Sequence, residues 1–378
     1  MPPPRKSQFK RADIVAAALL LAFIFFAVSN ILTNLEAAGA KPGFGFLSKE
    51  AGFDVSEALI PYSPSEPYFR VILAGVLNTL WLSVVCILCS TVIGVLFGLL
   101  SVGPSPVGRW LARSYVDLFR NLPKILILLV LYVTAVNGLP HVRQALSLEP
   151  FHLSNRSINF PVPIWQISHI AVILSCLIGV VIWTCRSKFS NLVRPSCQPS
   201  TRVLFKLVAI ATPVLVVWAS GATLSFDVPV MKGFDFSGGG RVSLQFAVVA
   251  TTLSIYHGAQ IAEVVRGGLL AVPSGQFEAS QALGLKSWQT IRLVILPQVM
   301  RIVIPPMNNQ YVNLIKNTSI AIAVGYSDLM SVSGTIINQS FKPLEMMLIT
   351  MAIYLILCLS LTASVNRWHQ HITKRESR

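Results

Sequence analysis

The chain has 378 residues, of which 53% are hydrophobic and only 12% are charged, and its mean hydropathy is +0.66. A soluble domain of this length needs far fewer apolar residues to bury one core, so the composition predicts a polytopic membrane protein. The formal net charge of +15 does not indicate nucleic-acid binding, because the basic residues flank apolar runs in small groups and form no single basic face or tract. We therefore expect no nucleic-acid partner.

Apolar stretches of about 20 residues are long enough to cross roughly 30 Å of hydrocarbon. Such stretches lie near residues 13–35, 69–101, 117–139, 164–185, 204–225, 244–266, 302–325 and 345–366. With the N-terminus in the cytoplasm, the larger groups of Arg and Lys all fall on the inner side, as the positive-inside rule requires. We expect an all-α membrane fold of about eight transmembrane helices with both termini cytoplasmic.

The first region, residues 1–68, contains the first span and an acidic outer loop. Its basic start, its apolar run and small residues such as Ala27 and Ser29 also fit a cleaved signal peptide. Cleavage would leave the later topology unchanged, so both possibilities stay open.

The rest of the chain divides into four further regions. Residues 69–139 form the first part of a core, and residues 140–243 form an insertion with two extra spans. The insertion contains the glycine-rich string FSGGGR, which no GK[ST] follows, so we interpret it as an outer turn and not as a phosphate-binding loop. Residues 244–366 complete the core, and residues 367–378 form a basic cytoplasmic tail.

The cysteines and histidines do not predict a metal or redox site. The six cysteines lie in predicted spans or an inner loop, where a disulfide framework is not expected. Cys86 and Cys89 have C-x-x-C spacing, but a lone pair in an apolar helix favours packing. His257 lies well inside a core span with no second His at ligand spacing, so we interpret it as a packing or hydrogen-bonding residue.

Residues 273–297 form a half-polar segment between two spans, on the cytoplasmic side of the predicted topology. Ser274 is the candidate N-cap of a short helix, and Glu278 lies in an early turn, where an anion suits the helix dipole. Gly284 permits a turn that a side chain would obstruct. A second amphipathic stretch then ends at Pro297. This pattern predicts two short helices that either rest on lipid headgroups or dock on a cytoplasmic partner.

The segment resembles the EAA loop of ABC importer permeases, a pattern of Glu-Ala-Ala, three residues, Gly, nine residues, Ile, one residue and Leu-Pro. The positions that match in register are Glu278, Ala279, Gly284, Leu296 and Pro297. Ser280 replaces the second Ala and Val294 replaces the Ile. The strings GVLNTLWLS, YVDLFRNLP and RIVIPPMNNQYVNLIKNTSIAIAVGYSDLM resemble the polar amino acid branch of that family. The extra first span and the insertion resemble the larger permease of general L-amino acid transporters.

The resemblance implies a type I ABC importer transmembrane fold and uptake of polar L-amino acids across a bacterial cytoplasmic (inner) membrane. It implies a cytoplasmic ABC ATPase docked on the EAA loop, a periplasmic or extracellular solute-binding protein, and a second permease. The family branch favours a heteromer, although symmetry permits a homodimer equally well. The chain contains no Walker A motif, so we expect no enzyme activity and no cofactor of its own. ATP and magnesium would bind the partner ATPase.

Polar residues of the core near the membrane middle are the candidates for a substrate path. Lys316 lies about 20 Å along its helix from Arg301, and a cation at that depth is a functional candidate unless it pairs with a carboxylate or snorkels outward. An amino acid also needs a partner for its ammonium, for which Glu263 is a candidate, but an i,i+3 ion pair with Arg266 is favoured there. The full set of candidates is Lys316, Asn317, Thr318, Ser319, Asn313, Asn78 and Glu263. The only pocket can also belong to the partner permease.

Two other classes of membrane protein compete with this interpretation. An ion-coupled carrier or channel acting alone would carry charged residues in several helices and often a repeat symmetry. An intramembrane enzyme would need a catalytic pair such as Ser with His, or a metal cluster. The charges within the predicted spans are sparse and no repeat is evident, so the sequence favours a permease.

Overall fold

The structure is a computed structural model, and the residues that it describes are 11–37, 43–164 and 225–374. They divide into two compact units, which we treat separately. One unit comprises Met1–Leu129 with Val249–Arg378, and the other comprises Val130–Val248. The predicted spans at 164–185 and 204–225 lie outside the described residues.

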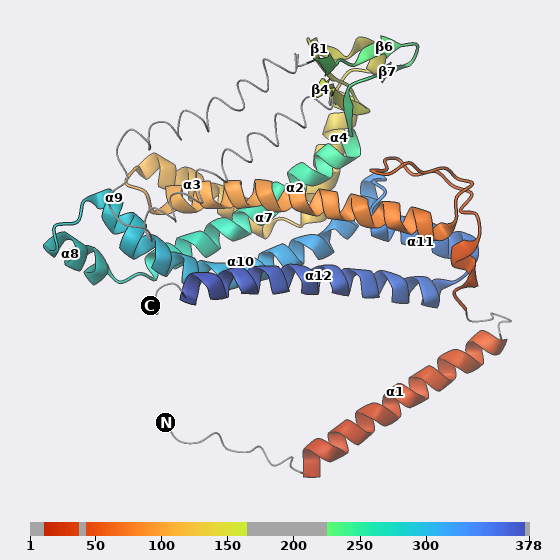
Figure 1. Cartoon of the computed structure of the whole chain (residues 1–378), viewed down its shortest axis with the longest axis horizontal. Coiled ribbons are helices and arrows are strands. Elements are labelled where there is room, and N and C mark those ends of the chain that lie inside the picture. The colour runs from red at the N-terminus through yellow and green to blue at the C-terminus, as the bar shows by residue number, and fades with distance from the viewer. Residues whose placement is uncertain (1–10, 38–42, 165–224, 375–378) are drawn as a thin grey trace, which may run out of the picture. The chain divides into compact units, whose positions relative to one another are not determined.

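The fold is a mostly helical membrane fold, as the sequence predicts. The helices that cover the remaining predicted spans are α1 (Arg11–Ala37), α2 (Tyr68–Val102), α4 (Lys124–Gly138), α7 (Leu244–Leu270), α10 (Leu296–Asn317) and α12 (Pro343–Lys374). Within the described ranges, three helical stretches are long and apolar enough to cross a membrane: Tyr68–Val102, Ser287–Val324 and Pro343–Gln370. In Figure 1, α2, α10 and α12 run lengthwise through the bundle.

The predicted span at 117–139 is wrong in one respect, because it is not one continuous helix. It is divided between α3 (Pro106–Asn121) and α4, which meet at an angle of 101°. Only if the two helices are taken together as one bent span do they add a fourth to the three above. The break lies at Leu122, which has an extended backbone (φ −86°, ψ 138°). Pro123 follows it, and the proline ring disfavours the helical conformation of the preceding residue.

Two glycines of α2 allow this helix to approach α7 closely. A Cβ atom on Gly94 would lie 2.4 Å from Cγ2 of Ile261, and one on Gly98 would lie 2.7 Å from Cβ of Val265. Helices in membranes associate mainly through such close packing, because lipid tails are as apolar as the side chains. The spacing of four residues places both glycines on one face of α2.

Residues 43–67, which we name the strap, pack onto the helix ends at the right of Figure 1. The strap contains a short 3-10 helix, η1 (Gly45–Ser48), and its Phe46 and Ala51 are buried. They share a hydrophobic cluster with Leu329 of α11 (Leu329–Ser340) and Met346 of α12. The sequence predicts only an acidic outer loop here, so the packed strap is a finding of the tertiary structure.

The unit Val130–Val248 contains short antiparallel strands where the sequence analysis predicts only loops. A four-stranded sheet has the order β1 (Leu146–Leu148), β2 (Phe151–Leu153), β3 (Ser157–Phe160) and β8 (Gly240–Ser243), after a 3-10 turn η2 (Val142–Gln144). Two smaller pairs are β4 (Val162–Pro163) with β5 (Phe226–Asp227), and β6 (Val230–Lys232) with β7 (Asp235–Ser237). Strands of two to four residues are too short to show an alternating pattern.

The glycine-rich string FSGGGR forms the turn from β7 to β8, which confirms a turn at this position. Gly238 and Gly239 both have positive φ, at 79° and 65°. The N–H of Gly239 donates to Oδ2 of Asp227 over 2.8 Å. This backbone N–H is therefore already bonded to a carboxylate, whereas a phosphate-binding loop would need it for the phosphate.

We predict that Gly94→Ala lowers the thermal unfolding midpoint of the detergent-purified protein. The added Cβ overlaps Ile261 and lies 3.0 Å from the backbone oxygen of Gly258, and overpacking of this kind costs about 1–3 kcal/mol. Gly267→Ala on α7 is the matched control, because no atom lies within 4 Å of its added Cβ. Equal midpoints for the two variants would contradict the close packing of α2 on α7.

Candidate functional site

The segment 273–297 forms a protruding pair of short helices, which we name the knob. It consists of α8 (Ser274–Ala282), α9 (Ser287–Gln289) and a π-helical stretch η3 (Thr290–Ile295) that leads into α10. Figure 1 shows α8 and α9 at the left end of the bundle, away from α11. The prediction of Ser274 as N-cap is wrong by one residue: Pro273 holds that position with an extended backbone, and its carbonyl accepts from Gln276 N–H over 3.0 Å.

The turn between the helices depends on the backbone of Gly284. Leu285 N–H donates to Ser280 O over 3.1 Å and Gly284 N–H donates to Gln281 O over 2.9 Å, which is the Schellman pattern of helix ends. Gly284 has φ +69°, the left-handed conformation that this pattern requires. The predicted turn is confirmed, and so is the need for glycine: L side chains rarely adopt this conformation, although no atom lies within 4 Å of an added Cβ. The constraint is the dihedral angle.

Neighbouring residues of the knob differ sharply in exposure. Glu278 and Ala279 are exposed, whereas Ser280 is 2% exposed and its hydroxyl donates to Gln276 O over 2.6 Å. A small side chain fits this buried position, which explains physically why Ser can stand where the EAA pattern has Ala.

The expectation that Pro297 ends the second helix is wrong. Pro297 lies in the first turn of α10, and the helix continues through it to Asn317. Proline has no N–H and its ring clashes with the carbonyl four residues earlier. The π-helical stretch Thr290–Ile295 directly precedes it, and such a widened turn accommodates the missing hydrogen bond without ending the helix.

The knob is joined to two long helices through a hydrophobic cluster. Val272, Ile295 and Val299 pack with Ile261 and Val265 of α7. One polar contact adds to this cluster, because Gln298 Nε2 donates to Gln276 Oε1 over 3.1 Å. A force on the knob is therefore transmitted to α7 and α10.

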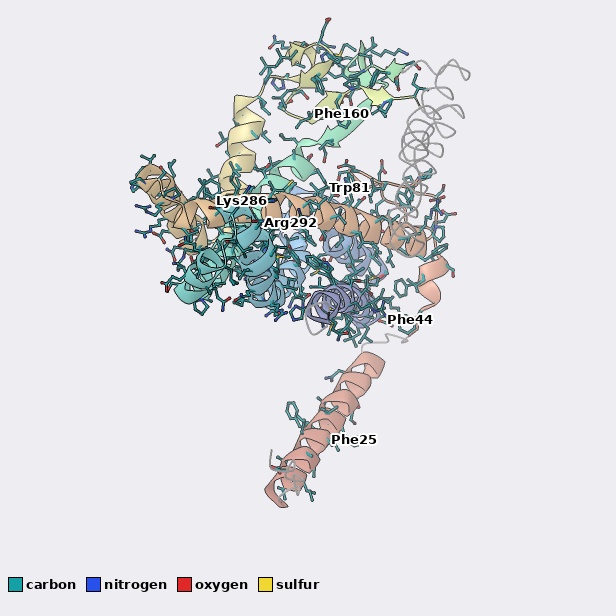
Figure 2. All side chains as sticks on the ribbon, turned by 60° about the vertical axis from the view of Figure 1, so that its left-hand side comes forward. Phe25, Phe44, Trp81, Phe160, Lys286 and Arg292 are labelled. Carbon is teal, nitrogen blue, oxygen red and sulfur yellow. The ribbon has the colours of Figure 1, made fainter. Side chains whose placement is uncertain are left out.

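The outer surface of the knob combines apolar and charged side chains. Leu283 is 79% exposed and Trp288 is 67% exposed. Lys286 and Arg292, labelled in Figure 2, are exposed on the same segment. Exposed apolar side chains with cations beside them are typical of a surface that is covered by a partner or by membrane headgroups.

The structure separates the substrate-path candidates of α10 onto different faces. Lys316 and Asn313 are exposed. Asn317 instead points to two polar side chains of the core: its Oδ1 accepts from Lys124 Nζ at the start of α4, and its Nδ2 lies 3.1 Å from Nε2 of His257 on α7. Successive residues of a helix point about 100° apart, so Lys316 and Asn317 cannot share one face.

Lys124 was not among the predicted site residues, although it lies within the predicted span at 117–139. A single cation directly before the apolar run ILILLVLY was the available signal. The interpretation of His257 as a hydrogen-bonding residue is confirmed by its contact with Asn317.

Thr318 and Ser319 follow Asn317 in the 3-10 helix η4 (Thr318–Val324), and both hydroxyls bond to their own chain. Thr318 Oγ1 donates to Ile315 O over 2.9 Å, and Ser319 Oγ donates to Lys316 O over 3.0 Å. They satisfy carbonyl groups where the α-helix changes into a 3-10 helix. This geometry favours a structural role for both residues.

Asn78 is 1% exposed, and its side chain joins the strap to the core. Its Nδ2 donates to the carbonyl oxygens of Glu57 and Ser327 over 2.7 and 2.8 Å. The neighbouring Thr79 Oγ1 accepts from Leu329 N–H over 3.0 Å. Both donor hydrogens of Asn78 are thus used within the fold, which favours a structural role over substrate contact.

Glu263 forms the ion pair that the sequence favours over an ammonium site. Two nitrogens of Arg266 lie 2.6 and 2.9 Å from its carboxylate oxygens, one helical turn away on α7. The pair lines a cavity of about 320 Å³ together with Arg113, Asp117 and Arg120 of α3. The predicted i,i+3 pair is confirmed.

Known proteins share this sequence over almost its whole length. The model of the family described as binding-protein-dependent transport system inner membrane component matches residues 202–378. The chain is 38% identical to the general L-amino acid transport system permease protein AapQ of Rhizobium johnstonii, over 94% of this chain and 90% of that protein. It is 32% identical to the glutamate/glutamine/aspartate/asparagine transport system permease protein BztB of Rhodobacter capsulatus, over 96% and 93%. The chain belongs to the amino-acid ABC transporter permease family.

Among solved structures, this permease aligns with a crystal structure of an amino acid ABC transporter with histidines. The TM-score is 0.48 and the sequence identity is 17%, over 80% of this chain and 95% of that chain.

We predict that Asn78→Asp destabilises the permease without changing the order of its substrates. The NH₂ group of Asn78 donates to two carbonyl oxygens, and the substitution puts a carboxylate oxygen, which can only accept, in its place. A buried polar group left without a partner costs about 1–3 kcal/mol. Limited proteolysis should then cut the strap sooner than in the wild type. Asn137→Asp is the control, because that amide is exposed and contacts only Val133 O of its own helix. A changed substrate order with normal stability would instead place Asn78 in the substrate path.

Proposed function

We propose that this permease is the transmembrane subunit of an ATP-driven importer of polar L-amino acids in a bacterial cytoplasmic membrane. Its family and the names of AapQ and BztB support amino acids as the cargo. The proposed partners are a cytoplasmic ABC ATPase, a solute-binding protein on the outer side, and a second, related permease. The protruding knob is the observation that carries the proposal.

The knob has the properties that an ATPase contact requires. It presents Glu278, Leu283 and Trp288 at its surface, whereas its inner side packs in the cluster with α7 and α10. The chain contains no GxxxxGK[ST] motif, so the energy of ATP hydrolysis must enter through a surface of this kind.

Movement of the knob would reach the membrane interior along α10. This helix runs for 22 residues from Leu296 to Asn317, which corresponds to about 33 Å at 1.5 Å per residue. The helix stays continuous through Pro305 and Pro306, so a displacement at the knob is passed along it to Asn317. Closure of paired ATPases would thereby switch two permeases between outward-facing and inward-facing states as rigid bodies.

The alternative role of the knob is to rest on lipid headgroups. Contact with lipid headgroups depends on which side chains the knob exposes and tolerates a change in the angle between α8 and α9. Docking into a protein cleft depends on that angle. Substitutions of Gly284, which sets this angle, therefore distinguish the two roles.

We predict that Gly284→Val abolishes uptake while the permease stays in the membrane. A β-branched residue is strained at φ +69°, whereas Asn tolerates this conformation, so Gly284→Asn should retain most of the activity. The measurement is uptake of radiolabelled amino acids by cells with matched permease levels on immunoblots. Wild-type uptake by the Val variant would reject the coupling role of the turn.

We predict that the tagged permease, purified from native membranes, brings an ABC ATPase and a second permease with it. In the Gly284→Val variant the ATPase should be lost and the second permease retained, because only the ATPase contacts the knob. A purified complex that contains this permease and the ATPase but no second permease would overturn the heteromer. Loss of both partners from the variant would indicate general unfolding.

A further inference from the structure

Three polar side chains meet in the core, in a cluster that the knob does not use. Lys124 of α4, His257 of α7 and Asn317 of α10 form a continuous hydrogen-bonded chain, with His257 only 2% exposed. His257 lies midway along the 27 residues of α7, about 20 Å from either end. Because α7 covers the predicted span at 244–266, we expect the cluster near the middle of the membrane, where a polar group is costly.

The backbone of the cluster is also unusual for a membrane helix. Asn317 is the last residue of α10, and the chain continues as the 3-10 helix η4 up to Gly325, which has φ +77°. Departure from α-helical geometry at membrane depth is tolerated where the backbone is buried in protein or lines a polar cavity. Broken helices of this kind form the substrate sites of many transporters.

The protonation states follow from the chemistry of the three groups. Lysine is only a donor, so Asn317 must turn its oxygen toward Lys124 and its NH₂ group toward His257. His257 Nε2 therefore accepts a hydrogen bond, and its ring is neutral. The cluster consequently carries one positive charge, on Lys124.

No anion balances this charge within the described part of the chain. The partners of Lys124 are the amide oxygen of Asn317 and the ring of Tyr256, whose centroid lies 6.0 Å from Nζ. The ion pairs that the structure records use Arg70, Arg241, Arg266 and Lys342 as their cations. Lys124 is the first residue of α4, where the positive end of the helix dipole adds to its charge, so a site of this kind favours an anionic ligand.

We propose that Lys124 and Asn317 bind the α-carboxylate of the transported amino acid, and that His257 is a positioning residue that fixes the Asn317 amide. This inference rests on the proposed function of amino acid import. An ammonium and an amide can both donate to one carboxylate. The NH₂ group of Asn317 has two hydrogens, so it can donate one to the ligand while it keeps its contact with His257. Every amino acid has this carboxylate, so the contact suits a permease of broad specificity.

Lys316 provides the matched control for Lys124. Both residues are lysines next to the same break in α10, but Lys316 is exposed and Lys124 contacts Asn317. If substrate binding were lost only because the permease has one positive charge fewer, the loss would appear whichever of the two lysines is replaced.

The experiment measures equilibrium binding of radiolabelled L-glutamate, L-glutamine, L-aspartate and L-asparagine to the purified permease complex without its binding protein. We expect Lys124→Met to weaken the binding of every bound amino acid about tenfold or more, because a hydrogen bond to a charged group contributes about 1.5–3 kcal/mol. Lys316→Met should bind like the wild type, and Lys124→Arg should lie within a few-fold of it. His257→Leu should weaken binding, and His257→Gln, which keeps an acceptor for Asn317, should restore it.

The outcomes separate this inference from the proposed function. Unchanged binding in Lys124→Met would overturn the inference alone, provided that the wild-type complex binds and imports amino acids. A loss confined to glutamate and aspartate would also overturn it, because Lys124 would then face a side-chain carboxylate. A wild-type complex that neither binds nor imports any of the four would reject the proposed function instead. Co-purification of the ATPase with each variant shows that the variant has folded. If Lys124→Met does not assemble, Lys124→Gln, which keeps a polar side chain without the charge, carries the test with the same expected loss.

Discussion

The close contact of α2 with α7 is the constraint on which the rest of the core depends. At Gly94 and Gly98 the two helices approach so closely that Ile261 and Val265 occupy the space of the missing side chains. Because the hydrophobic effect gives no drive for helix association inside lipid, such contact must come from packing. It holds in place the helix that carries His257 in its middle and the knob at its end.

The knob and the polar cluster share one mechanical element. Helix α10 begins in the hydrophobic cluster that holds the knob and ends at Asn317, where its regular geometry stops. A long helix transmits displacement along its axis, and a 3-10 break changes its hydrogen bonding at lower cost than a continuous helix does. The arrangement therefore places the length of α10 between the two sites and its 3-10 end beside the proposed substrate site.

Prolines show how a local rule can have two outcomes in one chain. Pro123 separates α3 from α4 through an extended Leu122, whereas Pro297 is accommodated by a π-helical stretch and leaves the helix intact. The local chemistry is the same in both, namely a missing N–H and a ring that crowds the preceding turn. The difference lies in the surroundings, because the residues around Pro297 are held by Ile295 and Val299 in the cluster with α7.

The sequence by itself determined the features that depend on neighbouring residues. Most of the long apolar helices, the turn at Gly284 and the Glu263–Arg266 pair were predictable, because apolar length, a glycine after a helix and an i,i+3 spacing act locally. Only the tertiary structure decided that Asn317 faces the core and Lys316 does not, that Lys124 reaches Asn317, and that the strap packs on α11. The physical reason is that a membrane helix is apolar on most of its circumference, so its composition predicts that it spans but not which face meets which neighbour.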